Sequence, residues 1–309
     1  MKKSLIAMSV AAVFAAPMAA NAAGTAYGQL QAEISQEDNG TVSNVVMKDN
    51  ARGRFGYKGS EELGNGMTMI GKMEYKVDTA DGDAGASGSG AGISLQKREM
   101  MVGLKQGWGT FSMGRLKSPY KYAGGVKYDA FVTTSLEARD DIMSSGAKGH
   151  NSFLSDMVGV SAMGGKLNVV YGIDETSGTS ADVVLSYKHK MGKKNELVFA
   201  HYAQGDAGDY SATKVGGKFG AIKFQVEATD TGTASDTYIF ASYGMKMAGG
   251  KLIIQGGQAD GDSYTDGTTS LVAGYVKKFS KKARWFAGIK TNSGDSEQQN
   301  LTYGMRFDY

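Results

Sequence analysis

The chain has 309 residues, of which 45 are glycine, two are proline and none is cysteine, and its formal net charge is +3. The absence of cysteine excludes disulfide scaffolds, thiolate zinc sites and cysteine nucleophiles. Glycine is about twice as frequent as usual but is not accompanied by proline, which argues against a collagen-like or proline-rich chain. No apolar run reaches 18 residues, so a bundle of transmembrane helices is also excluded.

The first 22 residues have the layout of a secretory signal peptide. Lys2 and Lys3 precede a 12-residue apolar run from Leu5 to Ala16, and a small-x-small cleavage pattern ends at Ala22. A run of this length is too short to span a bilayer but fits a secretory signal peptide. The alternative to a signal peptide is a buried N-terminal helix. We therefore expect a signal peptide over 1–22 and a single mature domain over 23–309. Without the two lysines the net charge falls to +1, which argues against nucleic acid as a partner.

The mature chain shows period-2 alternation and almost no helical periodicity. Between Met67 and Val77 the odd positions are mostly apolar and the even positions are mostly charged or polar. The same alternation occurs over Ile222–Ala228 and over Leu301–Tyr309. Alternation of this kind is typical of strands that separate two different media, but a soluble β-sandwich would show it too.

The number and spacing of these segments favour a barrel. Short turns and longer polar links alternate along the chain, which is the hairpin layout of an outer-membrane barrel. We therefore predict an all-β fold, a 16-stranded antiparallel transmembrane β-barrel, with 14 or 18 strands as the alternatives. The predicted strands are 25–35, 51–59, 67–77, 95–105, 109–115, 152–162, 166–174, 182–191, 195–204, 211–219, 221–229, 236–247, 251–259, 268–279, 284–291 and 300–309.

Glycine, proline and aromatic residues agree with this prediction. Glycine suits the bends and turns of a closed sheet, and the single mature proline, Pro119, falls in a predicted loop. Several aromatic residues fall near the short-turn ends of predicted strands, where a membrane-interface girdle is expected, although strand propensity alone also favours them. They are Tyr57, Trp108, Tyr187, Phe219, Phe279, Phe307 and Tyr309.

Two stretches resemble the general, trimeric diffusion porins of Gram-negative outer membranes. They are RGRFGYKGSEELGNG over residues 52–66, and Arg98 to Leu104 followed by GWGT and MGRLKSP up to Pro119. The chain also ends on an alternating segment closed by Tyr309, where the family usually has phenylalanine. In this family such an ending is read by the outer-membrane assembly machinery.

The resemblance implies a bacterial outer-membrane porin. It is expected to be a homotrimer surrounded by outer-membrane lipid and lipopolysaccharide, with a water-filled channel in each subunit for small hydrophilic solutes and ions. It also implies that the third external loop, here about 116–151, folds into the lumen and constricts it. No cofactor is implied.

The resemblance also implies which residues line the constriction. The family places loop carboxylates opposite basic residues on the wall, and the matching loop residues are Asp129, Glu137, Asp140 and Asp141. The matching wall residues are Arg54, Arg98 and Arg115, and alternation adds Arg52 and Lys72. A transverse field between such groups orients dipolar solutes, because a narrow low-dielectric mouth screens charge poorly. The plain alternative is that these arginines form ordinary surface ion pairs.

Other chemistry is weakly represented. An outer-membrane β-barrel enzyme would need a paired histidine, and the three histidines are His150, His189 and His201, with no GxSxG or HExxH motif. Acidic residues at Asp81, Asp83, Asp260, Asp262 and Asp266 lack the closing glutamate of a calcium loop. We expect solvated loops there and no metal site, with divalent bridging of lipopolysaccharide as the alternative.

A substrate-specific channel is the main alternative function. A sugar channel would use an aromatic path, for which only Tyr238, Phe240 and Phe286 have the inward parity. A phosphate channel would use a lysine-dense loop, for which the candidates are Lys117, Lys121, Lys127 and Lys148. A structural or adhesive role of the external loops is a further alternative.

Overall fold

The structure is a computed structural model, and it describes residues 23–80, 95–144, 153–173, 182–205 and 210–309. The predicted signal peptide over 1–22 therefore lies outside the described residues. Most of the described chain is β-strand, and three very short helical turns interrupt the longest connection between described strands. Among the residues described, no helix has both the length and the apolar character needed to cross a membrane.

The bounds of the elements are as follows. The strands are β1 (Ala23–Asp38), β2 (Ser43–Lys48), β3 (Arg54–Gly64), β4 (Met67–Lys76), β5 (Gln96–Gln106), β6 (Gly109–Lys117), β7 (Phe153–Ala162), β8 (Leu167–Gly172), β9 (Val183–Met191), β10 (Asn195–Ala203), β11 (Ser211–Phe219), β12 (Ile222–Asp230), β13 (Ser235–Met247), β14 (Gly250–Gly261), β15 (Thr268–Lys278), β16 (Ala283–Gly294) and β17 (Gln298–Asp308). The helical turns are α2 (Pro119–Tyr122), η2 (Gly125–Lys127) and α3 (Arg139–Ile142).

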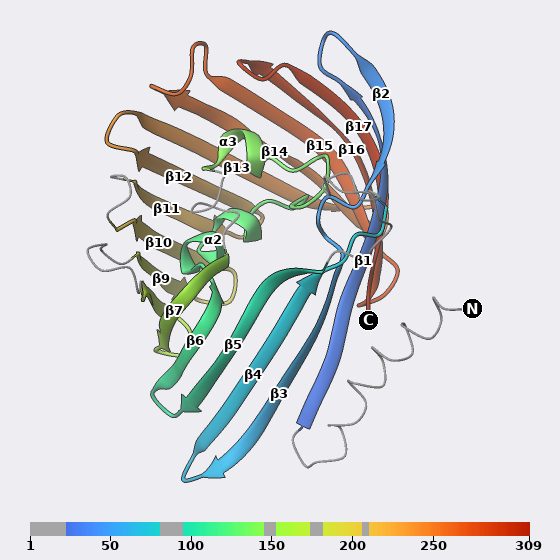
Figure 1. Cartoon of the computed structure of the whole chain (residues 1–309). Coiled ribbons are helices and arrows are strands. Elements are labelled where there is room, and N and C mark those ends of the chain that lie inside the picture. The colour runs from blue at the N-terminus through green and yellow to red at the C-terminus, as the bar shows by residue number, and fades with distance from the viewer. Residues whose placement is uncertain (1–22, 81–94, 145–152, 174–181, 206–209) are drawn as a thin grey trace, which may run out of the picture.

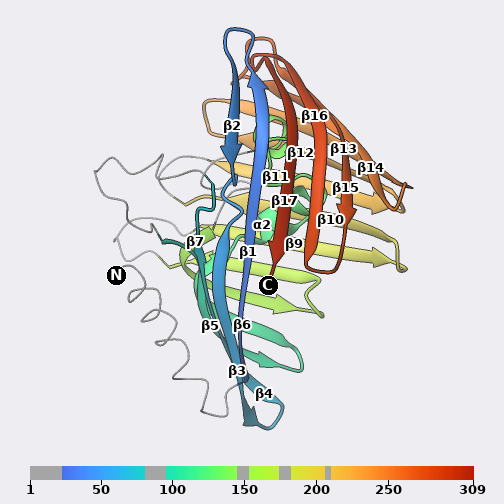
Figure 2. The ribbon, with the colours of Figure 1, turned by 90° about the vertical axis from the view of Figure 1, so that its right-hand side faces the viewer.

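The sheet closes on itself through its first and last strands. From β3 onward each strand pairs antiparallel with the next one in the chain, and β17 pairs with β1 over Gln29–Asp38. Backbone hydrogen bonds between Gly28 and Tyr309 extend this seam, with N···O distances of 3.2 and 3.0 Å. Among the described strands, closure gives both β1 and β17 a partner on each side, which is what a sheet surrounded by hydrocarbon requires. Figures 1 and 2 show the resulting barrel.

The prediction of sixteen barrel strands is confirmed, although seventeen strand elements are present. The reason is that β2 and β3 pair with successive parts of the same edge of β1, so together they form one interrupted barrel strand. The predicted strands 25–35 and 51–59 imply a polar link over residues 36–50. That expectation is wrong, because β1 continues to Asp38 and β2 occupies Ser43–Lys48 after a tight turn in which Asn39 Oδ1 accepts the backbone N–H of Val42 at 2.8 Å.

The outer face of the barrel is apolar and the inner face is mostly polar. Along β13 the residues alternate between exposed and buried, with Ile239 50% and Tyr243 44% exposed and Phe240 1% exposed. Large apolar side chains remain exposed on the outer faces of most strands, for example Leu271, Ile289 and Leu301. This band is the surface that lipid covers in an outer-membrane barrel.

Five of the seven predicted aromatic girdle residues lie at the ends of strands near the short turns, whereas Tyr57 and Tyr187 lie within β3 and β9. Trp108 is 52% exposed in the β5–β6 turn, and Phe279 is 66% exposed just after β15. Phe219, Phe307, Tyr309 and Tyr187 are also exposed, whereas Tyr57 is half-buried. Phe307 and Tyr309 stack on one another, with ring centroids 6.3 Å apart. Their position suits side chains that lie between headgroups and acyl chains.

Candidate functional site

The connection between β6 and β7 packs against the inner face of the barrel wall. We call its described part, residues 118–144, the inner segment, and it carries α2, η2 and α3. Figure 1 shows these helical turns surrounded by strands. Phe131 and Leu136 pack with Ile253, Val272 and Phe286 of β14, β15 and β16 in an apolar cluster that is almost fully buried. The inner segment therefore fills one side of the barrel interior.

Polar side chains of the wall hold the backbone of the inner segment. Gln225 Oε1 accepts the Gly125 N–H at 2.7 Å, and Gln255 Oε1 accepts the Ala130 N–H at 3.0 Å. Lys290 Nζ donates to Glu137 O at 3.0 Å, and Asn300 Nδ2 donates to Ser135 O at 2.9 Å. Hydrogen bonds from four different strands fix the segment in one position, because an unpaired buried polar group would be costly.

Basic side chains cover the wall on the other side, over β3 to β5. Arg54, Lys72 and Arg98 all form ion pairs with Glu74, at 3.7, 3.7 and 2.8 Å respectively. The Glu74 side chain is 2% exposed, and Tyr27 OH also donates to it at 2.9 Å. We call the set Arg52, Arg54, Lys72, Glu74 and Arg98 the basic wall.

The local sequence explains how these groups come together. Lys72 and Glu74 share the inner face of β4 by simple alternation, while Met69 and Met73 are exposed on the outer face. The β4–β5 register shifts between Met73 and Tyr75, which gives β5 one extra residue at this point. Such a bulge re-aims side chains. Here Arg98 bonds Glu74, and Glu99 forms ion pairs with Lys72 and with Lys117.

Arg52 and Arg115 lie apart from the Glu74 ion pairs. Arg52 precedes β3 and donates from Nη1 to Thr133 Oγ1 of the inner segment at 3.0 Å, so it bridges the basic wall and the segment. Arg115 pairs in register with Met100, next to the outward residues Val102 and Met113. Its guanidinium donates to Ser155 Oγ at 2.6 Å in an exposed pair. By this register the structure does not bring Arg115 to the basic wall.

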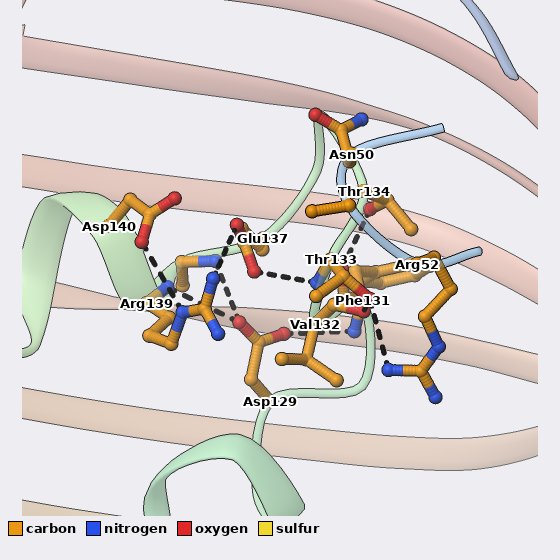
Figure 3. A network of polar contacts seen from close by, with 12 residues as sticks. Asn50, Arg52, Asp129, Phe131, Val132, Thr133, Thr134, Glu137, Arg139 and Asp140 are labelled. Carbon is orange, nitrogen blue, oxygen red and sulfur yellow. Dashed lines mark hydrogen bonds and ion pairs between the residues drawn. The ribbon is translucent and has the colours of Figure 1, made fainter. Parts of the chain in front are cut away.

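The four carboxylates predicted for the constriction have different surroundings. Asp129 accepts the backbone N–H groups of Phe131 and Ala138, and Glu137 accepts the N–H of Thr133, so both carboxylates hold the inner segment in shape. Asp141 pairs with Lys290 of β16 at 2.5 Å. Asp140 pairs with Arg139 at 3.3 Å and has a half-exposed side chain. Asp140 therefore has the most exposed side chain of the four, and Figure 3 shows its contact with Arg139.

The inner segment also presents basic groups toward the wall. Lys121 is 7% exposed, and its ammonium lies 4.6 Å from the ring centre of Phe153. Burial, together with the positive charges of Arg139, Arg98 and Arg54, lowers the pKa of Lys121 to about 7. Burial raises the pKa values of Glu137 and Asp141. The raised carboxyl pKa values reduce the negative charge of the inner segment, whereas the lowered pKa of Lys121 reduces its positive charge.

Sequence reasoning missed Glu74 and Glu33. Alternation placed Glu74 on the charged face of its strand, but nothing in the sequence indicated that three basic residues converge on it. Glu33 lies on the inner face of β1, is 1% exposed, and accepts the N–H of Ser135 at 2.7 Å. The available signal for Glu33 was a carboxylate between the uncharged residues Gln31 and Ser35 on the inner face, and for Glu74 it was a carboxylate between Lys72 and Lys76.

The residues of the alternative hypotheses are scattered. His189 is exposed and His201 Nδ1 contacts Thr213 Oγ1 at 2.8 Å, while His150, Asp81, Asp83 and Lys148 lie outside the described residues. Asp262 accepts the Ser235 N–H at 2.9 Å. In the described part of the chain, no group of three metal-ligating side chains could hold a metal ion. Of the aromatic candidates, Phe240 and Phe286 are buried, so they offer no surface to a sugar.

A closed antiparallel barrel with an apolar exterior and a charged interior is the architecture of outer-membrane channel proteins. The model of the Gram-negative porin family matches residues 7–297, and the chain belongs to this family. Its location is accordingly the bacterial outer membrane. The family consists of channels rather than enzymes, so the hydrolase alternative is set aside.

Individual relatives agree with this assignment. The chain is 30% identical over 214 residues to the major outer membrane protein P.IB of Neisseria gonorrhoeae. The aligned region covers 66% of this chain and 56% of that protein. The chain is thus matched to little more than half of that relative's length. The anion-selective porin from Comamonas acidovorans has a TM-score of 0.72 at 17% identity and covers 94% of this chain and 100% of that one. Vibrio cholerae OmpT, solved in a trimer form, has a TM-score of 0.63 at 15% identity and covers 93% and 99%.

Proposed function

We propose that the chain forms a water-filled channel for the passive diffusion of small hydrophilic solutes and ions. The observation that carries the proposal is the arrangement inside the closed barrel, where the inner segment faces a wall of charged side chains. Water and hydrated solutes would pass between the two. Charged groups that line such a passage exclude apolar molecules and set ion preference without tight binding.

The charges at the passage favour anions. The basic side chains there outnumber the carboxylates, and the carboxylates are already paired with them. The basic groups are Arg52, Arg54, Lys72, Arg98, Lys117, Lys121 and Arg139, and the acidic groups are Glu74, Glu99, Glu137 and Asp140. Arginine stays protonated at any physiological pH, and a narrow passage screens its charge poorly. We therefore propose that anions pass more readily than cations of equal size.

Recordings from the refolded protein in planar bilayers test both statements. The wild-type protein should show stepwise conductance that rises linearly with salt concentration. Its reversal potential in a salt gradient should indicate anion preference. Replacing Arg54 and Arg98 together by glutamine should shift that potential toward cations. Arg115→Gln is the matched control, because its guanidinium faces away from the passage, and it should leave the potential unchanged. An unchanged potential in the double variant would refute the role of the basic wall.

A channel specialised for anionic solutes is a second candidate, favoured by one cavity. A space of about 540 Å³ lies between α2 and strands β5 to β9. Lys117, Lys127, Lys188 and Tyr122 line it, and the ammonium groups of Lys117 and Lys127 lie 5.4 and 5.8 Å from the centre of the Tyr122 ring. Chloride conductance that falls and saturates on addition of inorganic phosphate would support this candidate. Conductance that stays linear would support the general channel.

We propose a homotrimer as the functional assembly. The fold shared with a barrel solved as a trimer supports it, as does the wide apolar outer face. Outer-membrane lipid, lipopolysaccharide near the acidic loops and the assembly machinery acting on Tyr309 complete the proposed set of partners. A trimer should resist SDS until boiled and then migrate as a monomer on a detergent gel. Migration as a monomer without heating would count against the trimer but not against the channel.

A further inference from the structure

The interrupted barrel strand contains an inward turn. In the register of β1, Gln29 is opposite Arg54 and Glu33 is opposite Lys48. Three residues of β1 are thus opposite the five residues 49–53, so the extra chain has to leave the sheet. Asn50 and Ala51 both adopt left-handed backbone conformations, with φ of +48° and +55°. Two consecutive non-glycine residues of this kind persist only where the surroundings hold them.

Buried polar groups hold this turn, which we call the Asp49 turn (residues 49–53). Asp49 is fully buried, and its carboxylate accepts the N–H groups of Ala51 at 2.9 Å and Thr79 at 2.8 Å. Gln31 of β1 donates from Nε2 to Asp49 O at 3.3 Å. Gly53 passes so close to β4 that a Cβ there would lie 1.9 Å from Val77 O. The turn is therefore a fixed part of the inner surface.

The Asp49 turn touches residues 131–137, which we call the tip of the inner segment. Arg52 Nη1 donates to Thr133 Oγ1 at 3.0 Å (Figure 3). Asn50 Nδ2 donates to Ser135 Oγ at 3.3 Å. Gln31 adds a bond from Nε2 to Thr133 O at 2.6 Å. Glu33 joins both sides, since its Oε1 accepts from Asn50 Nδ2 and from the Ser135 N–H and hydroxyl.

The tip has further anchors on the neighbouring strands β16 and β17. Lys290 of β16 donates to Glu137 O, and Asn300 of β17 donates to Ser135 O. The tip is thus held both by the Asp49 turn and by β16 and β17, and Arg52 is its contact with the basic wall. We propose that the Asp49 turn is a second constriction segment, which narrows the passage together with residues 131–137 and fixes the size of solute that passes. This inference rests on the proposed channel function.

The contacts between the Asp49 turn and the tip can be removed without removing the other anchors of the tip. Removing the side chains of Asn50 and Arg52 should remove their contacts with the tip, while the hydrogen bonds from Lys290 and Asn300 to the tip remain. The variant Asn50→Ala/Arg52→Ala should conduct more and admit larger uncharged sugars than wild type in liposome swelling. The single variant Arg52→Lys keeps the positive charge and a hydrogen-bond donor, so it should keep the wild-type size limit. Uncharged sugars separate this effect from the loss of a positive charge.

A matched control comes from another left-handed asparagine. Asn65 has φ +51° in the short β3–β4 turn, and in sequence it lies far from the inner segment. Asn65→Ala should leave the sugar size limit unchanged. An Asn50→Ala/Arg52→Ala protein with wild-type thermal stability, conductance and size limit would overturn the proposal. Absence of conductance in wild type would instead refute the channel function itself.

A cross-link keeps the test decisive if that variant fails to fold. The chain has no cysteine, so Asn50→Cys/Ser135→Cys introduces a unique pair at two side chains that now touch. Bridging the pair with a short bifunctional methanethiosulfonate should lower open-channel noise and restore the wild-type size limit, and reduction should reverse both. Equal noise and equal size limits in the bridged and reduced forms would overturn the proposal.

Discussion

Glu74 organises the basic wall at the scale of single residues. It is nearly buried, and it accepts from Tyr27 while it pairs with Arg54, Lys72 and Arg98. A buried carboxylate is stable only with partners of this kind, and the three cations in turn lose part of their mutual repulsion. The cations are thereby fixed in direction, which a channel needs if its field is to act on passing solutes.

Lys121 should make ion preference depend on pH. Burial and the nearby charges of Arg139, Arg98 and Arg54 lower its pKa to about 7, so the ammonium is present below that pH and lost above it. Between about pH 6 and pH 8 the passage loses most of one positive charge. The reversal potential in a salt gradient should therefore indicate stronger anion preference at pH 6 than at pH 8.

The matched variants for this prediction are Lys121→Met and Lys194→Gln. Methionine keeps an unbranched stem but cannot be protonated, so the pH dependence that remains in Lys121→Met belongs to histidines and other groups. Lys194 lies exposed in the β9–β10 turn, and its replacement should change nothing. The same pH dependence in Lys121→Met as in wild type would show that Lys121 does not titrate at the passage.

At the scale of elements, glycines on the inner face make room for the inner segment. In β15 a Cβ at Gly274 would lie 2.4 Å from Phe131 Cζ, and in β16 a Cβ at Gly288 would lie 3.0 Å from Leu136 Cδ1. The wall and the segment thus interlock through missing side chains. Part of the high glycine content of this chain has this origin, in addition to the turns.

Gly274→Ala should displace Phe131 and loosen the inner segment. Overpacking of a filled interior costs about 1–3 kcal/mol, and we expect a loss of this size in the free energy of unfolding, measured by urea titration in lipid vesicles. Gly71→Ala is the control, because a Cβ at Gly71 meets nothing within 4 Å. The double variant Gly274→Ala/Phe131→Leu should recover part of the loss. Equal stability of the two alanine variants would contradict the interlock.

The strands could be predicted from the sequence, whereas most of the site could not. Alternation is a local property, and it placed Arg52 and Lys72 on the inner face. The pairing of Arg98 with Glu74 depends on a bulge between two strands, and the burial of Asp129 and Glu137 depends on how the inner segment folds on itself. β2 was missed because the short run Val45–Met47 follows turn residues and carries no charged alternation.

At the scale of the whole molecule, the barrel separates two environments within the thickness of one strand. Ile289 lies near the middle of β16, 49% exposed, and it is opposite Leu301 of β17, which is 57% exposed. The next residue, Lys290, points inward and binds Glu137 O and Asp141. Neighbouring residues thus face hydrocarbon and a hydrated, charged interior. The stability of the whole depends on this alternation being kept around the barrel.

Charge on the outer face should therefore destabilise the barrel according to its depth. Ile289→Lys places an ammonium near the bilayer midplane and should lower the free energy of unfolding in lipid vesicles by about 2–4 kcal/mol. Thr269→Lys, on the outer face at the start of β15, should cost only about 0–1 kcal/mol because its ammonium reaches the interface. Both variants can be compared with wild type by urea titration of tryptophan fluorescence. Equal costs at the two positions would mean that the outer face of β16 is not in contact with lipid, as expected if a neighbouring subunit covers it in the trimer.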